Sequence, residues 1–137
     1  MSVLITRGQE NLNDAVGQAL DAFLAGSDLA RGVFIKPNIV FPVRPASGEI
    51  TSPALVRSLV AALRARHSGV DILLGEGVAA GCDAQENFRV SGFAALADEL
   101  GVPLVDLDGA ERVTVEWQFG RLSLPRAAFE RIYISLP

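Results

Sequence analysis

Apolar residues recur at helical spacing in three stretches of the chain. The first stretch begins at Leu12 and ends at Leu24. The second begins with "SPALV", where Ser52 suits the N-cap position and Pro53 the first helical position, and it ends in "RARHSG". The third stretch is "GFAALADEL", residues 92–100. These patterns predict amphipathic helices, each with one apolar face turned toward a core.

Short runs of aliphatic residues with the length of buried strands lie between and beside the predicted helices. They are residues 2–6, 32–36, 70–77 and 102–108. Because such runs alternate with helices, the pattern predicts an α/β fold: a mostly parallel sheet with flanking helices, in three layers. A chain of 137 residues has the size of one domain, so we assign residues 1–137 to a single α/β domain.

The periodicity changes after the last of these runs. In "RVTVEWQFGRLSL" the apolar residues Val113, Val115, Trp117 and Phe119 alternate with polar ones. A period of two indicates half-exposed strands, so we predict an antiparallel hairpin that turns near Gly120. A final strand is predicted over residues 131–137.

A long segment without periodicity joins the second predicted strand to the second helix. Its sequence is "PNIVFPVRPASGEIT", with three prolines. Connections of this length in compact domains are usually lids or binding loops, and prolines reduce the entropy that such a loop loses on ordering. We therefore expect an ordered loop with a functional role.

Polar residues follow several predicted strands where they end. In an open α/β sheet, ligands bind at the carboxyl ends of parallel strands. We expect a ligand-binding site there, formed by Lys36, Asn38, Thr51, Ser52, Gly75, Glu76 and Gly77. A lysine beside a helix N-terminus favours an anionic small molecule, such as a phosphate or carboxylate. The same residues also have structural interpretations, as loop, turn and helix-cap residues.

A metal site is an alternative interpretation of the same edge. Glu76 lies at the end of the third predicted strand, and Asp106 and Asp108 lie at the end of the fourth. A set of oxygen ligands would favour magnesium or calcium over zinc. The site prediction itself includes no metal ligand.

Composition excludes several functional classes. The net charge of −4 and the lack of a basic cluster argue against nucleic acid. Cys82 is the only cysteine, so this chain ligates no iron–sulfur cluster by itself. No apolar run is long enough to cross a bilayer, and Arg7 and Glu10 interrupt the start of the chain before a signal-peptide core, so we expect a cytoplasmic protein.

Several of these segments in this order resemble the family called domain of unknown function 362 (DUF362). They are "IKPNIV", "GEITSPALVRSLVAAL", "ILLGEG", "FRVSGFAALADELGVPLVDLD" and "LPRAAFERIYISLP". The family's Lys-Pro-Asn pattern falls on residues 36–38 and its Thr-x-Pro pattern on residues 51–53. The resemblance implies an α/β fold without an established activity. Family members usually continue beyond the position of Pro137, so the resemblance leaves two alternatives: a short relative, or the N-terminal portion of a longer family domain.

Two functions from different classes follow from these observations. The first is the binding of an anionic small molecule at the carboxyl edge of the sheet. The second is a non-catalytic interaction module, because half of the residues are apolar and a terminal strand can leave an unpaired edge. Such a module would form a homo-oligomer or dock on a redox partner protein, since the resemblance links some family members to iron–sulfur modules.

Overall fold

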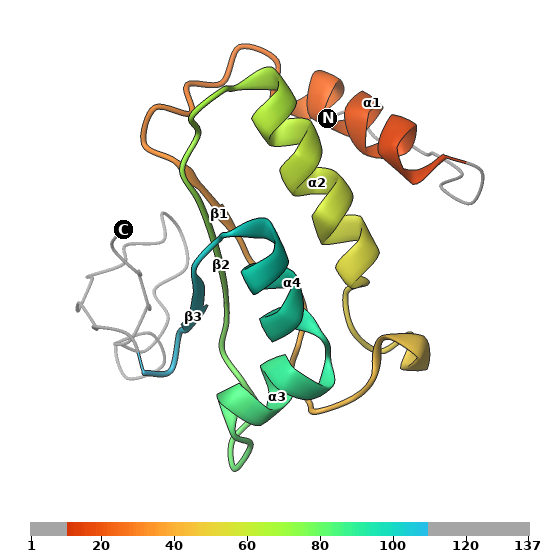
Figure 1. Cartoon of the computed structure of the whole chain (residues 1–137), viewed down its shortest axis with the longest axis vertical. Helices are drawn as coiled ribbons and strands as arrows, with labels where there is room; N and C mark the ends of the chain where they lie inside the picture. Colours follow the sequence, from red (N-terminus) through yellow and green to blue (C-terminus); the bar gives the residue numbers. More distant parts are fainter. Residues whose placement is uncertain (1–10, 110–137) are drawn as a thin grey trace, which may run out of the picture.

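A computed structural model describes residues 11–109 of the chain (Figure 1). The helices and strands follow one another in the order α1 (Leu12–Phe23), β1 (Val33–Ile35), the short 3-10 helix η1 (Pro45–Ser47), α2 (Pro53–Arg66), β2 (Ile72–Glu76), α3 (Ala84–Val90), α4 (Phe93–Leu100) and β3 (Leu104–Asp106). This alternation of strands and helices confirms the α/β class. The strands predicted over residues 2–6 and 131–137, and the hairpin predicted over residues 113–119, lie outside the described residues.

The described strands form one parallel sheet in the order β1-β2-β3. Ile35 pairs with Leu74, and Glu76 at the end of β2 pairs with Asp106 at the end of β3. Every strand pairing within residues 11–109 is therefore parallel, as predicted. Because the strands run in one direction, their carboxyl ends lie along a single edge of the sheet.

The helices α2, α3 and α4 cover one face of this sheet, and α1 packs on α2 (Figure 1). The core lies between that face and the helices. It contains Ile35, Ile72 and Leu74 from the sheet together with Val56, Val60, Leu63, Phe88, Phe93 and Leu96 from the helices. Full burial of one such side chain contributes about 1.5–3 kcal/mol, so this layer supplies the main driving force for folding.

The opposite face of the sheet is not covered by a helix among residues 11–109 (Figure 1). Phe34 points to this side and is 43% exposed. Its ring lies over Gly75, where an added Cβ would come within 2.9 Å of the ring and 3.1 Å of the Val105 carbonyl oxygen. The described residues thus form two layers rather than the three that the sequence predicted.

The predicted start of the second helix is confirmed: Ser52 is the N-cap of α2 and Pro53 is its first residue. The Ser52 side chain makes no capping hydrogen bond, and Pro53 removes one of the N–H groups that would need a cap. The helix α3 was not predicted. Asp83 caps it by accepting a 2.7 Å hydrogen bond from the Glu86 N–H, and Asp83 followed by Glu86 is the capping-box spacing that could have revealed it.

No helix among the described residues is long and apolar enough to span a bilayer.

Candidate functional site

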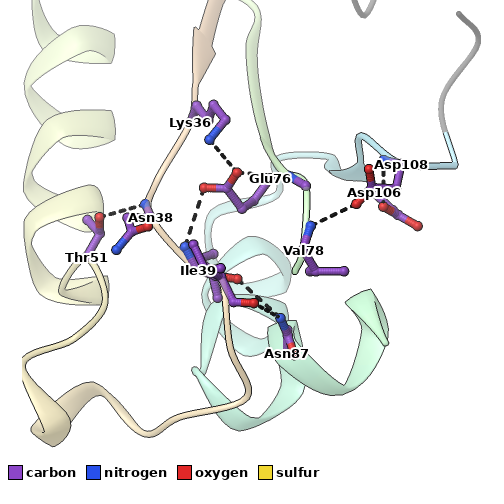
Figure 2. A network of polar contacts seen from close by, with 11 residues as sticks. Lys36, Asn38, Ile39, Thr51, Glu76, Val78, Asn87, Asp106 and Asp108 are labelled. Carbon is purple, nitrogen blue, oxygen red and sulfur yellow. Dashed lines mark hydrogen bonds and ion pairs between the residues drawn. The ribbon is translucent and has the colours of Figure 1, made fainter. Parts of the chain in front are cut away.

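The ends of β1 and β2 carry an ion pair between Lys36 and Glu76 (Figure 2). Lys36 directly follows the last residue of β1, and Glu76 is the last residue of β2. The pairing of these neighbouring strands brings the two side chains together, because Ile35 and Leu74 are already in register. The ammonium of Lys36 contacts the Oε1 atom of Glu76. The prediction that these two residues share the carboxyl edge is consistent with this geometry.

The carboxylate of Glu76 is buried and fully engaged. Only 2% of the residue is exposed. Besides the lysine, Oε1 accepts a 2.9 Å hydrogen bond from the Gly77 N–H, and Oε2 accepts a 3.4 Å hydrogen bond from the Ile39 N–H. A buried charge is costly unless it is paired and hydrogen-bonded. These three donors, all near strand ends, therefore stabilise the carboxylate in its place.

The long loop after β1 is closed at its base by Asn38 and Thr51. The Asn38 N–H donates a 2.8 Å hydrogen bond to Thr51 Oγ1, and the Thr51 N–H donates back to the Asn38 carbonyl at 3.0 Å. The Asn38 side-chain amide also donates to the Glu49 carbonyl at 3.0 Å. The loop therefore has a defined closure, and these polar groups of Asn38 and Thr51 serve that closure.

A further buried residue, Asn87 of α3, is hydrogen-bonded to the backbone of the same loop (Figure 2). Its Nδ2 atom donates to the carbonyls of Ile39 at 3.3 Å and Val40 at 3.0 Å. The sequence analysis did not identify Asn87. The capping box at the start of α3 would have placed a helix there, but not its contact with the loop.

The carboxylates at the end of β3 bind backbone N–H groups. Asp108 accepts a 2.8 Å hydrogen bond from Val78, and Asp106 accepts a 2.9 Å hydrogen bond from the N–H of Asp108. Within the described part of the chain, no group of three or more His, Cys, Asp or Glu side chains could hold a metal ion. The alternative of a metal site at Glu76, Asp106 and Asp108 is not supported.

The predicted site residues thus separate into groups. Lys36, Glu76 and Gly77 are in direct contact. Asn38 and Thr51 form the neighbouring closure of the loop. Ser52 is exposed beside Thr51, and Gly75 lies under Phe34 on the other face of the sheet. An added Cβ at Gly75 would meet that ring, so this glycine has a packing role.

Two grooves among the described residues lie away from this edge. One of about 490 Å³ runs between α1 and α2 and is lined by Gly17, Ser58 and Arg66 among others. A second groove of about 310 Å³ shares Asp21 and Arg66 with it. None of the predicted site residues lines either groove. The Lys36–Glu76 pair is therefore a feature of the sheet edge and not the floor of either groove.

Lys36 is chemically distinct within the whole sequence. It is the only lysine, whereas the other basic side chains apart from His67 are arginines. Arginine engages the carboxylates of the other ion pairs among residues 11–109, as Arg57 does with Glu99. An ammonium is a compact charge with three N–H donors, while a guanidinium forms a planar fork. The Lys36–Glu76 pair thus differs from the other ion pairs described, because its cation is an ammonium and not a guanidinium.

A comparison with protein-family models places this architecture in a family. The model described as "Domain of unknown function (DUF362)" matches residues 33–137, from the first residue of β1 onward. The chain therefore belongs to the DUF362 family. Searches of curated proteins and of solved structures gave no match.

Proposed function

We propose that this domain binds an anionic small molecule, with Lys36 as the main contact at the carboxyl edge of the sheet. The observation that carries the proposal is the unequal burial of the ion pair: the side chain of Lys36 is 58% exposed, while that of Glu76 is 2% exposed. The buried carboxylate anchors the ammonium and leaves it accessible. Anchoring of this kind reduces the entropy that a lysine side chain loses when it binds a ligand.

The ammonium retains donors for a ligand. It has three N–H groups, and one contact to Glu76 leaves the others available to ligand oxygens. The carboxylate also offsets the positive charge, so long-range attraction of anions is weaker than for an unpaired lysine. We therefore expect recognition through short, charge-assisted hydrogen bonds to a carboxylate or phosphate group.

The sole lysine allows a direct test. Protein grown with lysine labelled at 13Cε and 15Nζ gives one side-chain signal, from Lys36. We expect inorganic phosphate or citrate at millimolar concentration to shift this signal in a saturable way, while sodium chloride of equal ionic strength does not. If phosphate, citrate and pyrophosphate all leave the signal unchanged, the proposal fails. Arg44→Ala, which removes an exposed cation from the same loop, is the control and should bind like the wild type.

The face of the sheet that no helix of residues 11–109 covers favours a second candidate function, self-association. The side chains on this face of the described strands are apolar, with Phe34 paired beside Leu73, and Gly75 beside Val105. Because this patch carries no charge, a second copy of the chain can pack on it without burying an unpaired ion. Phe34→Ser should then shift sedimentation from dimer to monomer, whereas Phe23→Ser, at an exposed phenylalanine of α1, should not. A wild-type monomer at high micromolar concentration would exclude this candidate.

The cytoplasmic location and the redox partner stay predictions from the sequence and from the family resemblance. Neither is needed for the anion-binding proposal.

A further inference from the structure

We infer that Asn87 is a positioning residue for the Lys36–Glu76 pair, acting through the backbone of Ile39 and Val40. Asn87 is completely buried, at 0% exposure, and lies on α3 beneath the loop. Its Nδ2 atom donates to both of these consecutive loop carbonyls. The inference deepens the proposed function, on which its ligand-binding part rests.

The backbone at Ile39 and Val40 is a meeting point of three segments. The Ile39 N–H donates to Glu76 Oε2 at the end of β2. The Val40 carbonyl also accepts a 3.2 Å hydrogen bond from Ala79, in the segment between β2 and α3. Asn87 adds the helix to this arrangement. A shift of the loop away from Asn87 would therefore carry the Ile39 N–H away from the carboxylate that anchors Lys36.

The link to Glu76 is sensitive to small displacements. The bond from Ile39 to Glu76 is 3.4 Å long, near the upper limit for a hydrogen bond, while the bond from Gly77 to the same carboxylate is 2.9 Å. If the loop relaxes, Glu76 keeps its contacts with Gly77 and Lys36 but loses the donor on Oε2. The Glu76 carboxylate then interacts more strongly with the Lys36 ammonium, and the position and solvent exposure of the lysine side chain change.

The side-chain amide of Asn87 forms its hydrogen bonds through its NH2 group. Its Oδ1 atom is buried and has no hydrogen-bond partner among residues 11–109, whereas the Nδ2 atom has two. An unpaired buried acceptor is unfavourable, so an apolar residue would fill this place at a lower cost if packing were the sole requirement. The bonds to the loop are therefore the feature that the amide provides.

The experiment replaces the amide with a carboxylate of almost the same shape. In its ionised form the Asn87→Asp side chain has no hydrogen to donate, and its charge faces two carbonyl oxygens; because burial raises the pKa of a carboxyl, the measurements extend from acidic to alkaline pH. We expect the labelled Lys36 signal to shift and the amide exchange of Ile39 to accelerate about tenfold. Acidification should partly reverse both effects relative to the wild type, because a protonated carboxyl can donate to the Val40 carbonyl.

Ser91 supplies a matched control. It is also completely buried, but its hydroxyl donates to the Phe88 carbonyl at the end of α3 and has no bond to the loop. Ser91→Ala should lower the melting temperature without moving the Lys36 signal or the exchange of Ile39. A merely structural role for Asn87 predicts that both variants affect these readouts alike, and that result would overturn the inference.

The remaining outcomes are also decisive. An unchanged Lys36 signal in folded Asn87→Asp across this whole pH range refutes the positioning role. If that variant does not fold, the Lys36 signal and the exchange of Ile39 are measured in Asn87→Ala, which also lacks both N–H donors, and the same criteria apply. The two proposals can also be separated. If the substitution at Asn87 shifts the Lys36 signal but phosphate and the other anions do not shift it in the wild type, the positioning role stands and the proposed function fails.

Discussion

Lys36 and Glu76 share one ion pair but lie in different environments, with 58% of the lysine side chain and 2% of the glutamate side chain exposed. The Arg57–Glu99 pair differs, because both of its side chains are about half exposed. Exposed pairs of that kind contribute little to stability, whereas a buried carboxylate depends on each of its partners. The pair at the sheet edge should therefore respond strongly to the loss of one member.

The first prediction concerns this dependence. Lys36→Ala leaves the buried Glu76 carboxylate with two N–H donors and with no counter-ion among the described residues. We expect the free energy of unfolding to fall by about 1–3 kcal/mol, less than for a fully buried pair because the lysine is exposed. In a Glu76→Gln background the same substitution should cost much less. Urea denaturation of the two single variants, the double variant and the wild type at pH 7 measures this coupling, and additive losses would contradict it.

The second prediction concerns Gly75. An alanine Cβ there would come within 2.9 Å of the Phe34 ring and 3.1 Å of the Val105 carbonyl oxygen. The ring can move aside but the backbone of β3 cannot do so cheaply, so we expect Gly75→Ala to destabilise the fold by about 1–3 kcal/mol. Gly77→Ala should cost less, since its nearest contact is the Asp108 carboxylate at 3.3 Å. Equal losses in urea denaturation would show that the close approach of the Phe34 ring and the β3 backbone to Gly75 is not the cause.

Lys36 and Glu76 show which part of the site the sequence could predict. Their position at one edge follows from buried runs that alternate with helices, because such runs form parallel strands whose carboxyl ends coincide. The sequence did not predict that they pair with each other. The sequence pattern is the same whether the lysine at the strand end is ion-paired or not. Pairing depends on side-chain contacts between neighbouring strands, which the pattern does not specify.

Asn87 and Ser52 show why the remainder could not be predicted. Asn87 contacts a loop that is remote in the sequence, and periodicity does not specify the path of a loop. Ser52 has the residue type and the position of a helix cap, yet no capping bond forms. Side-chain to backbone bonds of both kinds depend on local geometry more than on residue type. The fold is therefore easier to predict from sequence than the contacts that orient the site.

The third prediction concerns the closure of the loop. Thr51→Val keeps the shape of the side chain but removes the oxygen that accepts the 2.8 Å hydrogen bond from the Asn38 N–H. We expect a loss of about 0.5–1.5 kcal/mol and faster hydrogen exchange at the Asn38 amide. Ser47→Ala removes a bond to the Glu49 N–H within the loop and is the control. If its effect on the Asn38 amide matches that of Thr51→Val, the closure is not specific to Thr51.

The last prediction concerns pH and the contact between α2 and α4. Hydrogen bonds of 2.8 and 2.7 Å from Arg57, and the positive charge of that residue, lower the pKa of Glu99 from its ordinary value of 4.5. A carboxyl with a lower pKa in the folded state stabilises the fold above its unfolded pKa, and the contribution is lost as the pH falls through the lowered value.

We therefore expect Glu99→Gln to have a slightly lower melting temperature than the wild type at pH 7. The difference should disappear in acid, where the wild-type carboxyl is protonated as well. Asp98→Asn is a suitable control, because Asp98 is an exposed carboxylate on the same helix with no ion pair among the described residues. Melting curves of the three proteins across this pH range decide the matter, and a difference between Glu99→Gln and wild type that persists in acid would mean that packing rather than charge links the two helices.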